Sequence, residues 1–433
     1  MSVVLRGINV VQQYLLDVSS RRQNDIPLEV YIAFPKSLTD SKVAEHVKTA
    51  WLYGNNREVV SLDLLTKDRI PLLFRPTGLM VDWYMITVWI HTPSGLTVRV
   101  PLSVLNTLGN STVEKVNNLH DYLYVEARKE KSYLVAEKIT ALRGKIETEI
   151  AEKILAGTEM SVLEVMLTGL GYKPEKPVKR VYLPRIVSWF KGFDGYPLHV
   201  AQFTLPETGK TTFGLRSETL FNWRYIPEPP TLARLVLDGR TGVLGEVFMR
   251  NGLVFDEFDK WTLDSADRQY TFETILTGME QGKWERGISA QGVRVPEMGR
   301  HIPIVFFGNL GRMEDLSSVA EKNTRAWFTT VYSRQLKGDM RPLADRVAWI
   351  DVCFKDIRIM DYVTYKVLPD SVLRGIVQII QRDVKPCDVS KLRGRLKRHA
   401  NNLYAVLSQI VKVSPEQVDG YVSGQLNLDE VLS

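Results

Sequence analysis

The stretch Leu253-Val254-Phe255-Asp256-Glu257-Phe258-Asp259-Lys260 decides how the central part of the chain is interpreted. Three apolar residues run directly into paired carboxylates, which is the pattern of a buried strand that carries acidic side chains at its end. Around Mg²⁺ and a nucleotide, the aspartate orients the hydrated metal and the glutamate polarises the attacking water. The stretch therefore predicts a strand-borne site for a metal-bound nucleotide.

A candidate phosphate loop lies upstream of this stretch. The short apolar run His199–Phe203 leads into Thr204-Leu205-Pro206-Glu207-Thr208-Gly209-Lys210-Thr211. In the pattern GxxxxGK[ST], Thr204 replaces the first glycine, while Lys210 would reach the β- and γ-phosphates and Thr211 would bind Mg²⁺. A turn before a helix is the alternative interpretation. The residues expected to bind nucleotide here are Pro206, Glu207, Thr208, Gly209, Lys210, Thr211 and Thr212.

Two later segments could complete such a site. The apolar run that ends at Asn309 places an amide where it could hold the attacking water, although an asparagine also commonly closes a strand into a turn. Arg346 precedes a β-like run over 347–354, and an arginine from a neighbouring subunit can stabilise transition-state charge. A surface ion pair is the alternative for Arg346.

The order of these motifs resembles that of the AAA+ ATPases. Asp256–Lys260 is similar to the DEFDK stretch of the minichromosome-maintenance (MCM) helicases, Thr277–Gly282 to their MEQ segment, and Pro342–Arg346 to their arginine-finger motif. The part from Leu183 to Thr212 also resembles the Lon-like ATPase of bacterial BREX defence systems. The resemblance covers residues 180–410, and it implies ATP and Mg²⁺ as cofactors.

The resemblance also implies a role for each matching residue. Lys210 and Thr211 would hold phosphate and Mg²⁺, Asp256 would hold the metal and Glu257 would be the catalytic base. Asn309 would be the first sensor and Arg346 a finger that acts on a neighbouring subunit. The second sensor would be an arginine that opens a lid helix, for which Arg374, Arg393 and Arg395 qualify and the latter two are preferred.

The family's pore hairpin would correspond to residues 282–294. Lys283, Arg286 and Arg294 would contact DNA phosphates there, and Trp284 would stack on bases. An ordinary solvated face is the alternative interpretation of these three basic residues.

The composition is that of a soluble globular protein, with 44% hydrophobic and 24% charged residues and a net charge of +6. Cys353 and Cys387 are the two cysteines, which fits neither a disulfide framework nor a paired-cysteine metal site, so a reducing cytoplasm is expected. The sequence shows neither a signal peptide nor an apolar run of the ~20 residues that a membrane span requires.

We expect an α/β fold with an AAA+ P-loop NTPase core, that is, a parallel sheet flanked by helices. The expected domains are a β-rich N-terminal domain over 1–110, a helical spacer over 111–172, the ATPase core over 180–362 and a C-terminal helical lid over 363–433. The spacer is expected because Glu, Lys, Ala and Leu dominate from Thr112 to Leu155 without proline. Strands are expected at Leu28–Phe34, Trp83–His91 and Leu96–Leu102, a linker at Gly169–Lys179 and a helix at Val389–Ile410.

Three functions are compatible with these features. The first is an ATP-driven ring, expected to be a hexamer, that binds DNA and translocates on it or unwinds it. The second is a remodelling or loading ATPase that acts on a polypeptide partner, with Trp284 as the gripping aromatic residue. The third is an inactive homologue, because Thr204 replaces the loop glycine. Val347-Ala348 after the arginine, where the family has Phe-Asp, and the lack of N-terminal zinc-knuckle cysteines separate the chain from the replicative helicases.

Overall fold

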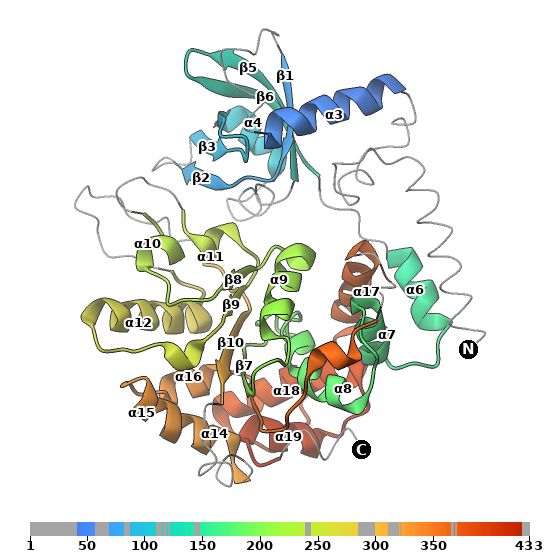
Figure 1. The fold of residues 1–433 in the computed structure, drawn as a ribbon, viewed down its shortest axis with the longest axis vertical. Coiled ribbons are helices and arrows are strands. Elements are labelled where there is room, and N and C mark those ends of the chain that lie inside the picture. The colour runs from blue at the N-terminus through green and yellow to red at the C-terminus, as the bar shows by residue number, and fades with distance from the viewer. Residues whose placement is uncertain are drawn as a thin grey trace.

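The computed structural model describes residues 41–56, 69–81, 87–109, 115, 119, 122–142, 148–238, 244–284, 299–310, 320, 322–364, 368 and 370–426. Two sheets dominate these residues, and each belongs to a different part of the chain (Figure 1). The expected strand at 28–34 lies outside the described residues.

The central sheet is parallel throughout, in the order β11-β7-β10-β9-β8. Its strands are β7 (Val200–Thr204), β8 (Arg224–Ile226), β9 (Leu253–Phe255), β10 (Ile304–Asn309) and β11 (Trp349–Cys353). The expected parallel α/β sheet is confirmed. The four strands other than β8 are buried almost throughout and are mostly apolar, as expected for a parallel sheet covered on both faces.

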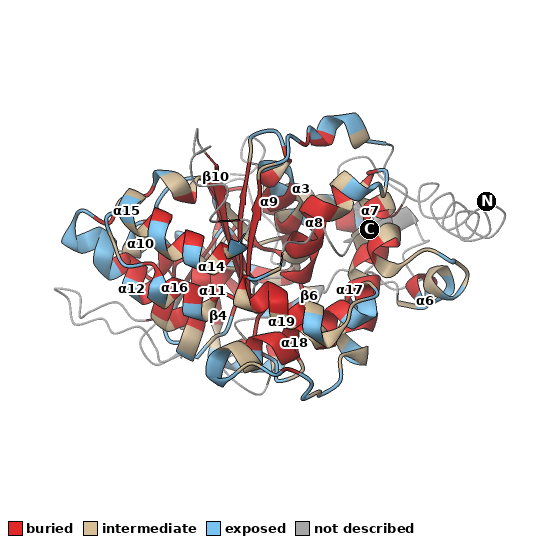
Figure 2. Ribbon diagram, turned by 90° about the horizontal axis from the view of Figure 1, so that it is seen from below, coloured by how far each residue is buried: buried red, intermediate tan, exposed pale blue. Residues whose placement is uncertain are grey.

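Helices cover both faces of this sheet, and alternate strand residues face different helices. Val305 and Phe307 pack with one helix set, and Ile304 and Phe306 with the other. The first set comprises α7 (Val162–Leu170), α8 (Lys176–Val187), α9 (Lys210–Phe221), α17 (Asp370–Asp383), α18 (Gly394–Ile410) and α19 (Pro415–Ser423). The second comprises α10 (Leu232–Leu235), α11 (Glu246–Met249), α12 (Ala266–Gln281), α14 (Thr324–Trp327), the π-helix η6 (Phe328–Tyr332) and α16 (Arg341–Arg346). Figure 2 shows buried strands between helices that expose their outer sides.

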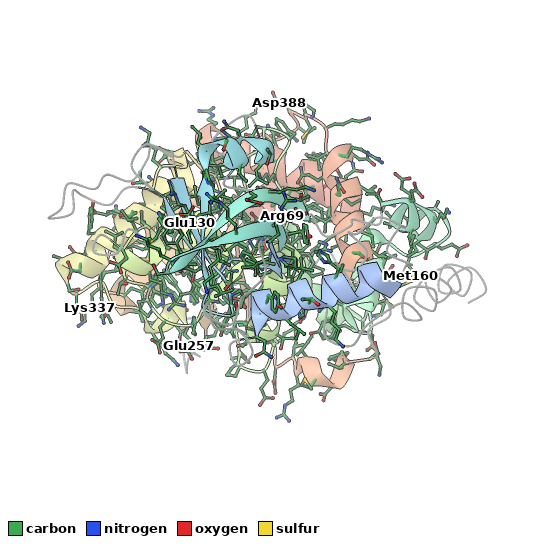
Figure 3. The ribbon with its side chains drawn as sticks, turned by 90° about the horizontal axis from the view of Figure 1, so that it is seen from above. Arg69, Glu130, Met160, Glu257, Lys337 and Asp388 are labelled. Carbon is green, nitrogen blue, oxygen red and sulfur yellow. The ribbon has the colours of Figure 1, made fainter. Side chains whose placement is uncertain are left out.

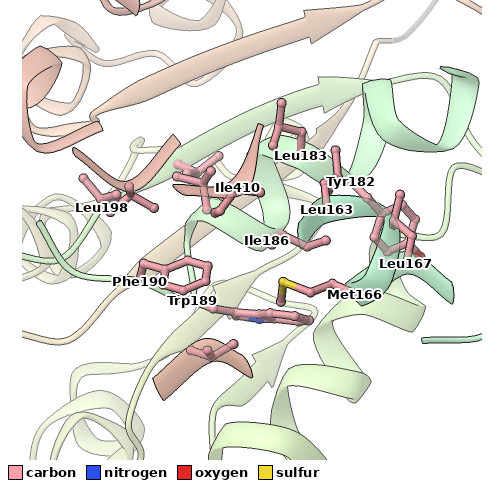
Figure 4. Packing of buried hydrophobic residues seen from close by; sticks show 14 of the residues in the cluster. Leu163, Met166, Leu167, Tyr182, Leu183, Ile186, Trp189, Phe190, Leu198 and Ile410 are labelled. Carbon is pink, nitrogen blue, oxygen red and sulfur yellow. The ribbon is translucent and has the colours of Figure 1, made fainter. Parts of the chain in front are cut away.

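The first of these two cores joins segments that are far apart in the chain. Met166 of α7, Trp189 and Ile410 of α18 belong to one buried cluster (Figure 4). The indole of Trp189 stacks on Phe213 of α9, with 5.2 Å between ring centroids. The C-terminal helices therefore share a core with α7, α8 and α9. The limits of a separate lid domain remain a prediction.

The N-terminal sheet has six strands in the order β1-β5-β6-β4-β3-β2. Its elements are α3 (Ser41–Asn55), β1 (Ile70–Phe74), β2 (Gly78–Val81), β3 (Thr87–His91), β4 (Thr97–Pro101), α4 (Leu102–Leu105), η3 (Asn106–Leu108), β5 (Tyr122–Glu130) and β6 (Tyr133–Leu142). The expected hairpin is confirmed, since β3 and β4 pair antiparallel around Gly95, whose φ is 88°.

The expected helical spacer over 111–172 is wrong for much of its length. Residues 122–142 form the antiparallel hairpin β5–β6, and β5 joins the sheet through β1. Leu123, Val125 and Ala127 are buried and alternate with less buried residues, which is the period of a strand. Pairing with β1 and burial of these side chains override a composition that favours helix. Helix is found at α6 (Thr148–Ala156), which contacts α17, and at α7.

The expected linker at 169–179 is also wrong. Leu170 ends α7, and α8 begins at Lys176 with Pro177 in its first turn, where a proline is tolerated. The helix expected at 389–410 begins later, at Gly394. Within the described part of the chain, no helix is long and apolar enough to cross a membrane.

Candidate functional site

The loop between β7 and α9 has the geometry of a phosphate cradle. It contains two residues with left-handed backbone, Glu207 at φ 64° and Gly209 at φ 76°, and α9 begins at Lys210. A Cβ on Gly209 would lie 3.0 Å from Ile359 Cγ2 and 3.1 Å from the Tyr182 hydroxyl. Glycine is therefore needed at 209 for both its φ and its close packing. The free N–H groups of the following helix favour an anion here.

The side chain of Lys210 folds back onto the start of the loop. Its Nζ donates to Thr204 Oγ1 at 3.0 Å and to the Leu205 carbonyl at 3.2 Å. The side chain is buried, and burial, followed by the nearby Arg185 cation, lowers the pKa of Lys210 to about 8. An anion in the loop would offset both effects and favour the charged form.

Thr204 is accommodated without the glycine that the phosphate-loop pattern prefers. It ends β7 in register with Asn309 and Cys353, and it is not among the described residues with positive φ. Its hydroxyl shares a 2.7 Å hydrogen bond with Thr208 Oγ1 across the loop. The replacement therefore adds a contact within the loop without backbone strain.

The acidic pair meets this loop at the carboxyl end of the sheet, where ligands bind in open α/β folds. Asp256 follows β9, and its Oδ2 accepts a hydrogen bond from Thr211 Oγ1 at 3.2 Å. Glu257 has a left-handed backbone at φ 50°, forms an ion pair with Lys260, and is 41% exposed. Figure 3 shows Glu257 at the periphery of the molecule. Left-handed backbone at a non-glycine residue is characteristic of functional sites.

A cavity of about 370 Å³ lies between the loop and the acidic pair. Its lining comprises Pro206, Glu207, Thr208, Gly209, Lys210, Thr211, Thr212, Asp256, Glu257, Asn309, Arg358, Ile359 and Met360. All seven loop residues singled out in the sequence, both carboxylates and Asn309 thus line one cavity. The backbone N–H of Asn309 donates to Asp259 Oδ1 at 2.8 Å, which fixes the end of β10 beside the acidic segment. Burial raises the pKa of Asp259.

The oxygen atoms at this edge suit a hard divalent cation. Thr211 Oγ1 and the Asp256 carboxylate face each other, and hydroxyl and carboxylate oxygens are ligands that Mg²⁺ accepts. In the described residues, no three His, Cys, Asp or Glu side chains gather as a metal cluster. Mg²⁺ often keeps several waters and shares phosphate oxygens with its substrate, so two protein ligands are compatible with its binding.

A buried polar network behind the loop was not expected from the sequence. Arg185 of α8 donates through Nε to Gln202 (2.6 Å), through Nη1 to the Thr208 carbonyl (2.8 Å) and through Nη2 to Thr208 Oγ1 (3.2 Å). Gln202 Nε2 donates to Asp351 Oδ2 at 2.9 Å, and Asp351 also pairs with Arg180 at 2.8 Å. The network ties α8, β7 and β11 to the phosphate loop.

Local pattern gave little sign of this network. Gln202 and Asp351 are polar residues inside otherwise apolar strands, and buried polar groups require partners. A polar residue inside an apolar strand was therefore the one sign of this network in the sequence. Arg185, the arginine that contacts Gln202, comes from α8, whose first residues were expected to be a linker.

The arginines expected to act on nucleotide do not line this cavity. Arg346 contacts Glu280 and donates to the carbonyls of Leu276 (3.0 Å) and Pro342 (2.8 Å). Arg395 contacts the other carboxylate oxygen of Glu280, and Arg393 is exposed at the start of α18. Neither Arg393 nor Arg395 lines the cavity of its own chain, and their role as second sensor remains a prediction.

The expected stacking role of Trp284 is also wrong. Its side chain is 2% exposed, its Nε1 donates to the Arg300 carbonyl at 2.8 Å, and its ring packs on Gly278. This burial removes Trp284 both as a base-stacking residue and as an aromatic residue that grips a polypeptide. Lys283 is exposed. Arg286 and Arg294 lie outside the described residues.

Three viral proteins are similar to this chain in sequence. Uncharacterized protein ORF425 of Acidianus filamentous virus 2 is 27% identical over 92% of this chain and 94% of its own length. ORF426 of Acidianus filamentous virus 1 is 27% identical over 84% of this chain and 88% of its own. Protein 440 of Sulfolobus islandicus rod-shaped virus 1 is 29% identical over 70% of this chain and 71% of its own length.

No family model matches the chain. Among solved structures, a full-length MCM homolog from Methanopyrus kandleri is similar at 13% identity, covering 96% of this chain and 98% of its own, with a TM-score of 0.47. Because this structural similarity is low, the functional proposal rests on the geometry of the site. The resemblance to BREX ATPases remains a prediction. The strand order shows a mixed α/β protein with a parallel sheet flanked by helices, and the loop over 206–212 and the acidic pair line a cavity at the carboxyl end of that sheet.

Proposed function

We propose that this chain is an ATP-hydrolysing AAA+ motor, similar to the MCM helicases, that assembles into a hexameric ring and translocates on or unwinds DNA. One observation carries the proposal: the phosphate loop and the acidic pair converge on one cavity, with Thr211 Oγ1 3.2 Å from Asp256 Oδ2. This is the arrangement that phosphoryl transfer to water requires, because its catalysis depends on positioning and charge stabilisation.

In this proposal each side chain has a defined task. Lys210, which contacts Thr204 and Leu205, would hold the β- and γ-phosphates together with the N–H groups at the start of α9. Thr211 and Asp256 would hold Mg²⁺, whose charge would stabilise the negative charge on the phosphates. Glu257 takes the proton of the attacking water, and Asn309 orients that water.

The ring belongs to the proposal because of the role expected of Arg346. Arg346 does not line its own cavity but lies with Arg395 around Glu280, and we propose that these arginines act on the cavity of a neighbouring subunit. The proposed DNA contact rests on the segment that begins at the exposed Lys283. The buried Trp284 favours neither client, because its burial removes both the base-stacking residue and the aromatic residue that would grip a polypeptide.

The test compares the natural chain with Glu257→Gln. We expect ATP hydrolysis that DNA stimulates, DNA binding that weakens with salt, and a variant that binds ATP but does not hydrolyse it. Particle imaging with ATP and Glu257→Gln should show closed rings. Hydrolysis that is indifferent to DNA, together with no salt-dependent DNA binding, would refute the DNA motor, and no ATP binding would refute the nucleotide site.

A further inference from the structure

Tyr225 touches both side chains proposed to hold Mg²⁺, although no phosphate-loop motif includes it. Its hydroxyl donates to Asp256 Oδ2 at 2.7 Å and lies 3.4 Å from Thr211 Oγ1. Tyr225 belongs to the edge strand β8, which pairs with β9, so Tyr225 lies opposite Val254, two residues before Asp256. It is not among the residues that line the cavity. The phenol thus supports the carboxylate without occupying the space for nucleotide.

Three contacts fix the tyrosine in this position. Its ring packs on Gly214 of α9 so closely that a Cβ there would lie 2.4 Å from Tyr225 Cδ2. Its backbone N–H donates to Glu218 Oε1 at 2.8 Å, also on α9. The N–H of Asp256 donates to the carbonyl of Ile226, the neighbour of Tyr225, at 2.9 Å. The helix that begins at the phosphate loop therefore also sets the position of the phenol.

The remaining contacts of Asp256 show what the phenol contributes. Oδ1 accepts the backbone N–H of Glu257 at 2.8 Å, while Oδ2 accepts both Tyr225 and Thr211. The phenol makes the shorter of the two side-chain contacts to Oδ2, at 2.7 Å against 3.2 Å from Thr211. Without it, the carboxylate would keep one firm contact and could rotate about its side-chain bonds. Partners that orient a metal-ligating carboxylate strongly affect metal affinity.

We propose that Tyr225 is a positioning residue of the Mg²⁺ site, which holds the Asp256 carboxylate in the orientation that binds metal. The inference rests on the proposed nucleotide site and adds to it a residue that controls metal affinity separately from nucleotide affinity. Its partners come from β8, β9 and α9, so the metal site depends on the junction of these three elements.

The test is Tyr225→Phe in the full chain, with calorimetric ADP and ATP binding measured over a range of Mg²⁺ and again in EDTA. We expect the half-saturating Mg²⁺ concentration to rise about 10- to 100-fold, while affinity in EDTA stays within about twofold of the natural chain. Tyr133→Phe is the matched control, because Tyr133 also donates to a carboxylate, that of Glu130 at 3.1 Å, but in the N-terminal sheet. It should leave the Mg²⁺ requirement unchanged.

A second variant tests the same inference with the phenol retained. Gly214→Ala should push the ring away from Asp256 and raise the Mg²⁺ requirement in the same direction. An unchanged Mg²⁺ requirement in Tyr225→Phe, or an equal loss of affinity with and without Mg²⁺, would overturn the role of Tyr225 and leave the proposed function standing. Failure of the natural chain to bind nucleotide at any Mg²⁺ concentration would overturn both.

Discussion

Thr208→Val tests whether the buried arginine behind the phosphate loop sets the shape of that loop. The Thr208 side chain is 1% exposed, and its hydroxyl accepts from Arg185 Nη2 at 3.2 Å and bonds Thr204 Oγ1 at 2.7 Å. Valine has nearly the same shape but makes neither hydrogen bond. The contact from Arg185 to the Thr208 carbonyl remains, so the change isolates the hydroxyl.

The expected loss follows from these two bonds. A hydrogen bond to a charged group contributes about 1.5–3 kcal/mol and a neutral one about 0.5–1.5 kcal/mol, so the free energy of unfolding should fall by about 2–4 kcal/mol. In the Thr208→Val variant the loop is less constrained before nucleotide binds, so binding must also order its backbone. Fixing the backbone of one residue costs about 1–2 kcal/mol, which corresponds to a Kd for ADP about 5- to 30-fold higher.

Denaturant unfolding and calorimetric ADP binding measure the two quantities. Trp189 stacks on Phe213 of α9 with its ring planes 10° apart, so its fluorescence should report unfolding of this core. Thr208→Ser is the control, because serine keeps the hydroxyl and should retain most of the ADP affinity. If the valine and serine variants have equal stability and equal ADP affinity, the hydroxyl does not order the loop and the reasoning is refuted.

Two further predictions concern the charges of the site. The pKa of Lys210 is lowered to about 8, so ADP affinity should fall as pH rises above about 8. Binding should take up protons, which calorimetry detects as a heat that depends on the buffer. The variant Lys210→Ala should bind ADP weakly and without this proton uptake. For folding measured without added nucleotide the pH dependence has the opposite sign. Between about pH 8 and the ordinary lysine pKa of 10.5 the unfolded chain binds more protons, so the contribution of Lys210 to the free energy of unfolding rises with pH. Arg346→Ala should abolish ATP hydrolysis in the assembled ring while ATP affinity stays within about twofold. The control Arg341→Ala removes an exposed arginine paired with Asp339, and it should change neither ATP hydrolysis nor ATP affinity. An equal loss of binding and hydrolysis in Arg346→Ala would contradict a role in the neighbouring site.

The sequence by itself determined the features that a short window encodes. The turn before α9, the buried strand Leu253–Phe255 and the turn at Thr92–Gly95 were located from the sequence, whereas the roles expected of the loop residues and of the acidic pair remain predictions. Each of these elements depends on a few consecutive residues whose backbone conformation and burial follow from their own types. The parallel sheet also followed, because strands buried on both faces are mostly apolar.

Tertiary structure decided what depends on partners distant in the chain. Residues 122–142 have a helical composition but form strands, because β1 offers an edge for pairing and a core for Leu123 and Val125. Trp284 reads as an exposed aromatic residue, yet Gly278 and the Arg300 carbonyl bury it. Arg185 and Tyr225 reach the site from a helix and an edge strand that no loop motif contains. A motif specifies the backbone that binds phosphate, whereas the groups that orient its ligands are chosen by packing across the whole sheet.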